Sequence, residues 1–273
     1  MTRKINKVKF FVNDNEKSHI VAKDLEIELL KYGFKIVNKD YDLAISVGGD
    51  GSFLRMVKEN NFNDNIYYIG VNSGTLGFLQ EIDIRNCVDF VKRLNTDNYK
   101  VEEIGIQETK IITENNILYF DSLNEIVVRN INFNTLKIPV YVDNELLEYF
   151  IGDGLLISTS TGSTAYNMSF GGSIVYNTLK TLSITPIAPL NNKVYSSLIN
   201  TVIVPSDKVI SLKPKGENSN IFLMVDGVNH RIDDVIKIET KIQDKTIKCL
   251  RMNDFHFIKV INDKILGEKK DSW

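Results

Sequence analysis

The chain has 273 residues, enough for one large domain or two of moderate size with a buried core in each. Hydrophobic residues make up 43% and charged residues 25%, which is the composition of an ordinary globular protein. The formal net charge of −2 argues against a protein whose main partner is nucleic acid or an anionic membrane.

The cysteines and the apolar segments indicate the cellular setting. Cys87 and Cys249 form no CxxC motif and no disulfide framework, so we expect both to be core residues in a reducing compartment. The first 17 residues have too short an apolar stretch for a signal peptide, and no segment approaches the roughly 18 apolar residues that span a bilayer. We therefore expect a cytoplasmic protein that does not enter the membrane.

The first third of the chain alternates β-rich runs with amphipathic helical patterns. In residues 15–32 apolar side chains recur every three or four positions, and Gly33 ends the pattern. Residues 42–47 are apolar on both faces, as in a central parallel strand. This order predicts an open, mostly parallel α/β sheet. The predicted strands are residues 7–12, 34–38, 42–47 and 66–71, and the predicted helices are residues 15–32, 53–60 and 85–94.

The polar segment 95–103 marks a change of pattern, and most of the chain after it is strand-like. Residues 169–181 are the exception, where we expect a short helix or irregular structure, and a helix is expected in residues 255–270. We predict an N-terminal α/β domain over residues 1–98 and a β-rich domain over residues 99–252. The strands predicted in the second domain are 106–114, 117–122, 125–130, 137–144, 146–159, 201–206, 208–214, 220–227, 230–240 and 246–252.

The sequence GGDG, residues 48–51, connects a predicted buried strand to a predicted helix. Such a loop directs backbone N–H groups and the positive end of the helix at one place, where anions bind. The Asp50 carboxylate cannot pair with a phosphate directly, but it can hold Mg²⁺ against phosphate oxygens or accept a proton from an attacking hydroxyl. The alternative is that Asp50 and Gly51 form a tight turn. Neither a Walker A motif nor GxGxxG is present.

Two further clusters are rich in polar side chains. Residues 152–172 carry six Ser and Thr hydroxyls between Ser158 and Thr164, followed by Tyr166. This suits a polar ligand with a flat base, although a Ser/Thr-rich loop between strands has the same composition. Asp153 in this cluster is also a common turn former. Asn124 and Glu125 interrupt an apolar strand, either as solvent-facing residues at a strand end or as a clamp for the two hydroxyls of a ribose.

The segments GGDGSFL, NSGTLGF, NE and GDGLLISTSTGSTAYN, in this order, resemble the NAD kinase family. GGDG alone is shared with phosphofructokinases and diacylglycerol-type lipid kinases, whereas GSTAYN with the upstream NE is more specific. The resemblance extends along most of the chain and is weakest before the glycine loop and in the tail. It implies a Rossmann-like, phosphofructokinase-like N-terminal domain, a β-rich NAD-binding domain, and a tail, residues 253–273, that packs back onto the first domain.

The resemblance also implies roles for individual residues. Asp50 would be the catalytic carboxylate, with Mg²⁺ nearby and no other metal ligand fixed, and Asn124 and Glu125 would hold ribose hydroxyls. Asp226 corresponds to a family position that can serve a neighbouring subunit's site, with a hairpin turn as the alternative. The remaining nucleotide-binding positions would be Gly49 and Gly51 in the loop, Asn72 and Phe78 on the adenosine side, Thr161, Thr164, Ala165 and Tyr166 around the adenine and ribose, and Asp153, Ser169 and Ala188 toward the nicotinamide.

Three positions depart from the family pattern. Ser52 stands where threonine is common, which keeps the hydroxyl, and Ser160 replaces a proline, so it is left out of the predicted site. Ile151 replaces an arginine that often precedes GDG, so any contact of that arginine is absent here.

The resemblance implies an enzyme that phosphorylates the 2′-hydroxyl of the adenosine ribose of NAD to form NADP, with Mg²⁺ and with ATP or inorganic polyphosphate as the donor. It also implies a homodimer or homotetramer without a nucleic-acid or membrane partner. The alternatives are another GGDG-loop kinase that acts on a lipid or a sugar, and a dinucleotide-binding sensor without catalysis.

Overall fold

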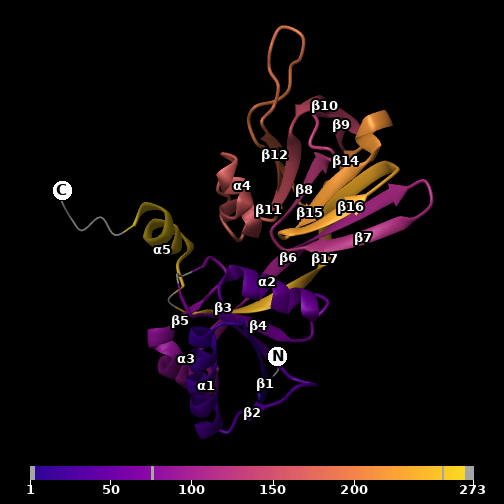
Figure 1. Cartoon of the computed structure of the whole chain (residues 1–273). Coiled ribbons are helices and arrows are strands. Elements are labelled where there is room, and N and C mark those ends of the chain that lie inside the picture. The colour runs from indigo at the N-terminus through magenta and orange to yellow at the C-terminus, as the bar shows by residue number, and fades with distance from the viewer. Residues whose placement is uncertain (1–3, 75–76, 254, 268–273) are drawn as a thin grey trace, which may run out of the picture. The chain divides into compact units, whose positions relative to one another are not determined.

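The computed structural model of the chain describes residues 4–74, 77–253 and 255–267 (Figure 1). The chain forms two compact units, of which unit 1 comprises Met1–Ile104 and Thr246–Trp273, and unit 2 comprises Gly105–Lys245. These boundaries lie a few residues from those expected from the sequence. The reason is that two long strands, β6 (Tyr99–Thr113) and β17 (Val235–Met252), each run from one unit into the other.

Unit 1 is built on a parallel sheet. Its strand order is β2–β1–β3–β4, and both β5 and the end of β17 pair with β4. All six residues of β3 and of β4 are buried, as expected for strands covered on both faces. The predicted α/β class with a mostly parallel sheet is confirmed. The strands of this unit are β1 (Lys7–Val12), β2 (Lys35–Ile36), β3 (Leu43–Gly48), β4 (Tyr67–Asn72) and β5 (Ile82–Asp83).

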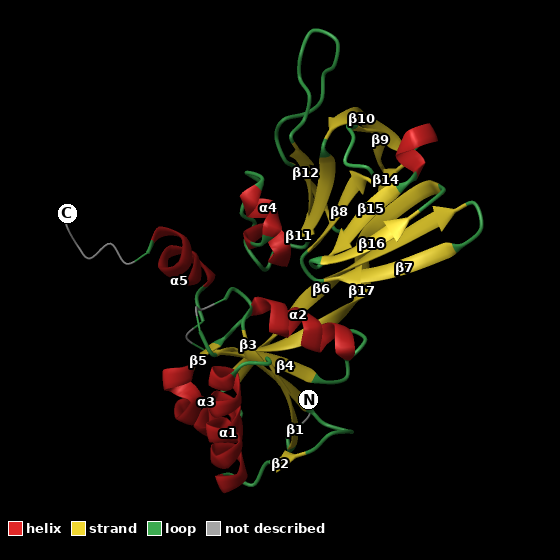
Figure 2. Cartoon of the chain, viewed as in Figure 1, coloured by secondary structure: helices red, strands yellow, loops and turns green. Residues whose placement is uncertain are grey.

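Three helices cover this sheet (Figure 2). Helices α1 (Glu16–Lys31) and α3 (Cys87–Asn95) share one core with the strand residues that point to their side of the sheet. Helix α2 (Asp50–Glu59) packs against β3 and β4 from the other face. The unit also contains α5 (Phe257–Ile261), which continues as a π-helical turn (Asn262–Leu266) within the segment where a terminal helix was expected.

Local signals explain the ends of these helices. The Asn15 side chain accepts the Ser18 N–H at the start of α1, and Gly33, at φ +83°, lets the Phe34 N–H reach the Leu29 carbonyl at its end. Helix α2 begins three positions before its predicted start, because Gly49 acts as the N-cap and its carbonyl accepts the Ser52 N–H. Asp50 is therefore in the first turn of a helix, and the alternative of a tight turn at Asp50 and Gly51 is wrong.

Unit 2 consists of two β-sheets whose inner faces form one core, so the β-rich prediction is also confirmed. One sheet has the order β13–β12–β11–β8–β15–β16, and the other brings together β10, β9, β14, β17, β6 and β7. The strands are β7 (Ile117–Ser122), β8 (Glu125–Asn130), β9 (Leu136–Val142), β10 (Glu145–Gly152), β11 (Gly154–Thr159), β12 (Thr181–Ile187), β13 (Val202–Pro205), β14 (Ile210–Leu212), β15 (Ile221–Val225) and β16 (Val228–Ile232).

Some sequence expectations about the β-rich part of the chain differ from the structure. No strand was predicted over β12, yet it lies between β11 and β13 and is almost entirely buried, with Pro186 opposite Leu155. The first strand of the β-rich part was predicted over residues 106–114, but β6 already begins at Tyr99, within the polar segment that marks the change of pattern. Within the described residues, none of the helices is long and apolar enough to cross a membrane.

Candidate functional site

In unit 1 the Asp50 carboxylate binds the backbone of the loop that follows β4. Its two oxygens accept the N–H groups of Phe78, at 2.7 Å, and Leu79, at 2.9 Å. The Gln80 amide donates to the Gly49 carbonyl over 2.8 Å, which ties the same two segments together. A carboxylate in the first turn of a helix also interacts favourably with the helix dipole. Asp50 is thus held in one orientation, and each of its oxygens can still accept a further hydrogen bond.

The glycines around Asp50 serve different purposes. A Cβ added to Gly77 would lie 1.8 Å from an Asp50 oxygen, so only glycine allows the loop to approach the carboxylate this closely. By contrast, a Cβ at Gly49 or Gly51 would meet no described atom within 4 Å, and both residues are exposed. The loop at Gly49 and Gly51 therefore offers open backbone to a ligand, whereas Gly77 serves the internal packing.

Asn72 and Phe78, expected on the adenosine side, lie at the two ends of the loop after β4. Asn72 is buried at the end of β4, where its amide donates to the Gly74 carbonyl and accepts the Gly74 N–H, both over 2.9 Å. Phe78 is partly exposed, and its backbone N–H is bound to Asp50. Residues 75–76 of NSGTLGF lie outside the described residues. The structure thus assigns Asn72 to shaping the loop and leaves Phe78 accessible.

In unit 2 a second carboxylate organises the Asn124–Glu125 pair. The Asp226 oxygens accept the N–H groups of Leu123, Asn124 and Glu125 at 2.8, 2.8 and 3.2 Å. Asp226 itself lies in the hairpin turn between β15 and β16, with φ +44°. The hairpin alternative is therefore correct for its backbone, and its side chain additionally fixes three consecutive residues of its own chain.

Asn124 and Glu125 are buried, not solvent-facing. Burial, together with the nearby Asp226 carboxylate, raises the pKa of Glu125 to about 8, although the backbone N–H of Tyr166 donates to Glu125 and opposes the shift. Asn124 Oδ1 and Glu125 Oε2 have no hydrogen-bond partner among the described residues. Buried oxygens without partners are costly, and a ligand hydroxyl would satisfy them.

The Ser/Thr-rich segment folds directly against this pair. The Asn124 carbonyl accepts the Thr159 N–H at 2.9 Å, and a Cβ at Gly162 would lie 2.1 Å from the same carbonyl oxygen. A short 3₁₀ turn (Thr161–Thr164) and helix α4 (Tyr166–Ser169) follow, in which Thr164 is buried and Tyr166 is exposed. Among the predicted residues, the structure brings together Asn124, Glu125, Thr161, Thr164, Ala165, Tyr166 and Asp226.

Asp153 and Ala188 form a separate pair at the other end of β11. The Asp153 N–H donates to the Ile187 carbonyl over 2.9 Å, and Ala188, next in the chain, has φ +44°. Both are exposed, as is Ser169 at the end of α4. Helix α4 runs over the outer face of β11, where Phe170 packs on Leu156 and Ile187. The predicted positions therefore follow the length of one strand, which suits an extended ligand better than a compact one.

Sequence reasoning missed several residues that hold these clusters. Asn167 is fully buried, and its amide bonds to the Ser163 and Ser173 carbonyls and to the Thr185 hydroxyl. Gln80 and Gly77 were likewise not singled out, since nothing in the sequence indicates that they contact Gly49 and Asp50.

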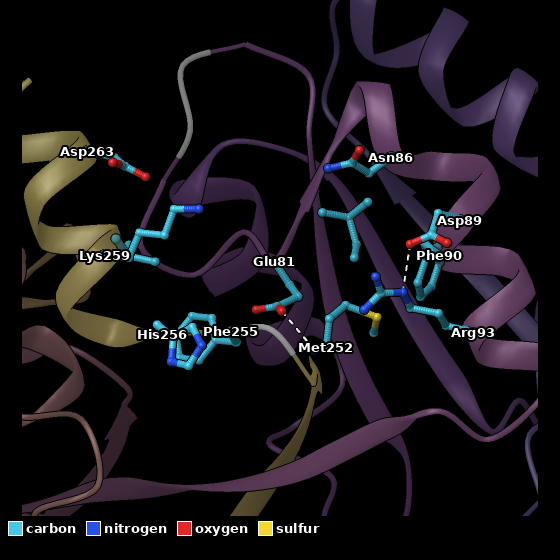
Figure 3. Close-up of a pocket in the computed structure, with 12 residues that line it drawn as sticks. Glu81, Asn86, Asp89, Phe90, Arg93, Met252, Phe255, His256, Lys259 and Asp263 are labelled. Atoms are coloured by element: carbon cyan, nitrogen blue, oxygen red, sulfur yellow. Dashed lines mark hydrogen bonds and ion pairs between the residues drawn. The ribbon is translucent and has the colours of Figure 1, made fainter. Parts of the chain in front are cut away.

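A cavity of about 260 Å³ in unit 1 contains none of the predicted residues (Figure 3). It lies between α3 and the C-terminal segment, with His256, Lys259 and Asp263 on one side. Three of its charged groups are engaged internally, since Arg93 pairs with Asp89 at 2.6 Å and Glu81 accepts the Met252 N–H at 2.8 Å. Its lining offers no motif for a particular ligand.

The described residues include no group of three or more His, Cys, Asp and Glu side chains that could form a metal cage. Mg²⁺ that bridges substrate phosphates usually takes only one or two protein carboxylates and completes its shell with phosphate oxygens and water. Asp50, with unused lone pairs on both oxygens, fits that mode.

The fold and the two clusters define a class of two-domain nucleotide-binding protein, with a glycine loop on a parallel sheet and a hydroxyl-rich cluster on a β-sandwich. Residues 3–99 match the family model of the ATP-NAD kinase N-terminal domain, and residues 123–252 match that of the ATP-NAD kinase C-terminal domain. The chain belongs to the NAD kinase family.

Individual relatives agree with this assignment. The NAD kinase of Finegoldia magna is 37% identical over 269 residues, covering 95% of this chain and 97% of the relative. That of Lactobacillus johnsonii is 33% identical over 276 residues, covering 97% of this chain and 99% of the relative.

Two solved structures share the fold. One is yeast NADH kinase complexed with NADH, with a TM-score of 0.83 and 20% identity over 99% of this chain and 90% of that chain. The other is an NAD kinase from Archaeoglobus fulgidus in complex with ATP, with a TM-score of 0.73 and 19% identity over 96% of this chain and 98% of that chain.

Proposed function

We propose that the chain transfers the γ-phosphoryl group of ATP to the 2′-hydroxyl of the adenosine ribose of NAD, which forms NADP and ADP. The observation that carries this proposal is the buried Asn124–Glu125 pair, since one oxygen of each side chain lacks a hydrogen-bond partner among the described residues. The membership of the chain in the NAD kinase family supports it. Two adjacent oxygens without partners suit the vicinal hydroxyls of a ribose, because a hydroxyl can both donate and accept a hydrogen bond.

In this proposal the two units divide the chemistry. Unit 2 recognises the dinucleotide: Asn124 and Glu125 bind ribose hydroxyls, Tyr166 stacks on the adenine, and the Asp153 and Ala188 end of β11 takes the nicotinamide half. Unit 1 supplies the groups for phosphoryl transfer, since the open backbone at Gly49 and Gly51 and the N-terminus of α2 bind phosphate oxygens.

Asp50 takes the proton of the attacking 2′-hydroxyl while the hydroxyl oxygen bonds to the γ-phosphorus and the bond to the ADP oxygen breaks. We assign this role to Asp50 because the two backbone N–H groups that it accepts hold the carboxylate in place and leave a lone pair on each oxygen to take a proton. Mg²⁺, when bound with the nucleotide by Asp50, would neutralise charge on the phosphates. A homo-oligomer in the cytoplasm is part of the same proposal, by resemblance to the family.

The test is NADP formation by purified protein with NAD and Mg²⁺, followed with an NADP-specific dehydrogenase. ATP and inorganic polyphosphate are compared as donors, and NADH, a diacylglycerol and a sugar as alternative acceptors. We expect NADP with ATP. Phosphorylation of the lipid or the sugar instead would assign a different kinase, and NAD binding without transfer from any donor would leave a dinucleotide sensor.

A further inference from the structure

Lys264 is a partly exposed residue with a buried ammonium group, and the sequence motifs do not include it. It lies in the π-helical turn after α5, and its Nζ atom is 4.1 Å from the centroid of the Phe78 ring. The Nζ atom is inaccessible to solvent and has no hydrogen-bond partner among the described residues. A buried ammonium whose three N–H donors are unused is destabilising, so its presence near Asp50 needs an explanation.

The charges that act on Lys264 come from three other segments of unit 1. Burial lowers the pKa of Lys264 to about 8, the carboxylates of Asp50 and Glu81 oppose this shift, and the Arg251 guanidinium adds to it. Neither carboxylate uses Lys264 as a donor: Asp50 accepts from Phe78 and Leu79, and Glu81 accepts from Met252 and Arg251. The Lys264 ammonium therefore interacts electrostatically with Asp50 and Glu81, but it donates a hydrogen bond to neither carboxylate.

We propose that Lys264 binds the phosphate oxygens of the phosphoryl donor at the glycine loop, residues 48–51, which contains Asp50. A glycine loop that carries a carboxylate has a charge of the wrong sign for a polyphosphate, and a P-loop lysine is missing from this sequence. Lys264 supplies the absent cation from the far end of the chain, and the Phe78 ring holds it by a cation–π contact until an anion arrives. This inference rests on the proposed function for the identity of the donor.

A purely structural role for Lys264 makes the opposite prediction about stability. If the lysine only clamped Phe78, replacing it with methionine would lose the cation–π contact and lower the melting temperature. If it is kept for an external anion, Lys264→Met removes an unpartnered buried charge while preserving most of the packing, and the melting temperature stays equal or rises. Stability without ligand and affinity for ligand should therefore change in opposite directions.

The experiment measures binding of inorganic tripolyphosphate by isothermal titration calorimetry, without metal, to the full-length wild type and to four variants. We expect Lys264→Met and Lys264→Gln to weaken binding at least tenfold and Lys264→Arg to restore it to within about threefold, because the guanidinium keeps the charge. Lys259→Met is the matched control and should leave the affinity unchanged within about twofold, since this exposed lysine of the same segment lines the cavity in Figure 3.

Equal tripolyphosphate affinity of the wild type and the folded Lys264 variants, or no binding by the wild type, would overturn the inference. A lower melting temperature for Lys264→Met would also count against it, and Lys264→Gln supplies the affinity if the methionine variant does not fold. NADP formation is measured separately. If the wild type makes no NADP but binds tripolyphosphate through Lys264, only the proposed function is refuted. If the wild type makes NADP and the Lys264 variants bind tripolyphosphate equally well, only this inference is refuted.

Discussion

The Asp50 region of unit 1 and the Asp226 region of unit 2 share one structural feature, a carboxylate that holds a backbone segment. In each, one carboxylate accepts consecutive backbone N–H groups from a segment distant in the sequence: Phe78 and Leu79 for Asp50, and residues 123–125 for Asp226. A carboxylate can accept several such bonds at once, and charge-assisted bonds are stronger than neutral ones. Each region thereby fixes a loop that would otherwise have several conformations.

The regions differ in the charge placed next to the carboxylate. Beside Asp50 is a cation, Lys264, whereas beside Asp226 is a second carboxylate, Glu125, whose pKa is raised to about 8. At neutral pH Glu125 is therefore mostly protonated, and its region presents neutral donors and acceptors. The Asp50 region is thus matched to an anionic ligand and the Asp226 region to uncharged hydroxyls.

Removing the Asp50 charge should have the largest effect. For Asp50→Asn we expect kcat for NADP formation to fall by roughly 10²- to 10⁴-fold, as for the loss of a general base, while the NAD dissociation constant changes by less than about threefold. Turnover assays and calorimetric NAD titration measure the two quantities. The control is Glu59→Gln, an exposed carboxylate at the other end of α2. Equal losses of turnover and NAD affinity would make Asp50 a binding residue.

Displacing Asp50 without changing its charge is the next strongest test. Gly77→Ala places a methyl group where the Asp50 oxygen now lies, so the loop or the carboxylate must move, and we expect kcat to fall about 10²-fold because misplaced catalytic groups are costly. Gly74→Ala in the same loop meets no described atom within 4 Å and should retain activity. If both variants were equally active, the position of Asp50 would matter less than we infer.

In the second region, Asp226→Asn should weaken NAD binding more than turnover. The amide cannot accept all three N–H groups, so Asn124 and Glu125 lose their fixed position, and we expect KM for NAD to rise about tenfold with a loss of about 1–3 kcal/mol in the free energy of unfolding. Steady-state kinetics and urea unfolding measure these changes.

Asp143→Asn is the matched control for this variant. Asp143 is also in a hairpin turn at positive φ and also accepts a backbone N–H, from Val209 at 3.0 Å, but it lies away from the predicted site residues. A KM for NAD that rises as much in Asp143→Asn as in Asp226→Asn would refute the positioning role of Asp226.

The last prediction concerns the pH dependence of stability, with no effect on the chemical step required. Because the pKa of Glu125 is raised from 4.5 to about 8, the folded state keeps a proton that the unfolded state releases between these values. The free energy of unfolding therefore falls as pH rises through this range, with a slope of up to about 1.4 kcal/mol per pH unit from this group. Glu125→Gln should reduce that slope in urea unfolding between pH 5 and 8.

Burial raises the pKa of Glu81 to about 7, so Glu81 also makes stability fall as pH rises, in the wild type and in Glu125→Gln alike. Only the difference in slope between these two proteins therefore reports on Glu125. Glu114→Gln, at an exposed position, is the control and should leave the slope unchanged. A slope that is identical in the wild type and Glu125→Gln would show that Glu125 is not protonated in the folded state.

Much of unit 1 could be predicted because its signals are local. The apolar runs predicted β3 and β4 within a residue or two, and Asn15 and Gly33 marked the ends of α1. In unit 2 the strand β12 was missed although Leu182 and Ile184 alternate with hydroxyl residues, because Pro186 within the run weakens the signal of a strand. Its burial comes from sheets and loops on both sides, which no local pattern reports.

The two-domain class, the glycine loop at Asp50 and the residue types that can bind a ribose could all be read from the order of the amino acids. The folded chain was needed to show that Asn124 and Glu125 are buried, that Asp226 holds them from about a hundred residues away, and that Lys264 lies against Phe78. Periodicity tells which face of a segment avoids water, but not which distant segment covers it. Charge balance at a site depends on those distant segments, so it becomes visible only once the chain is folded.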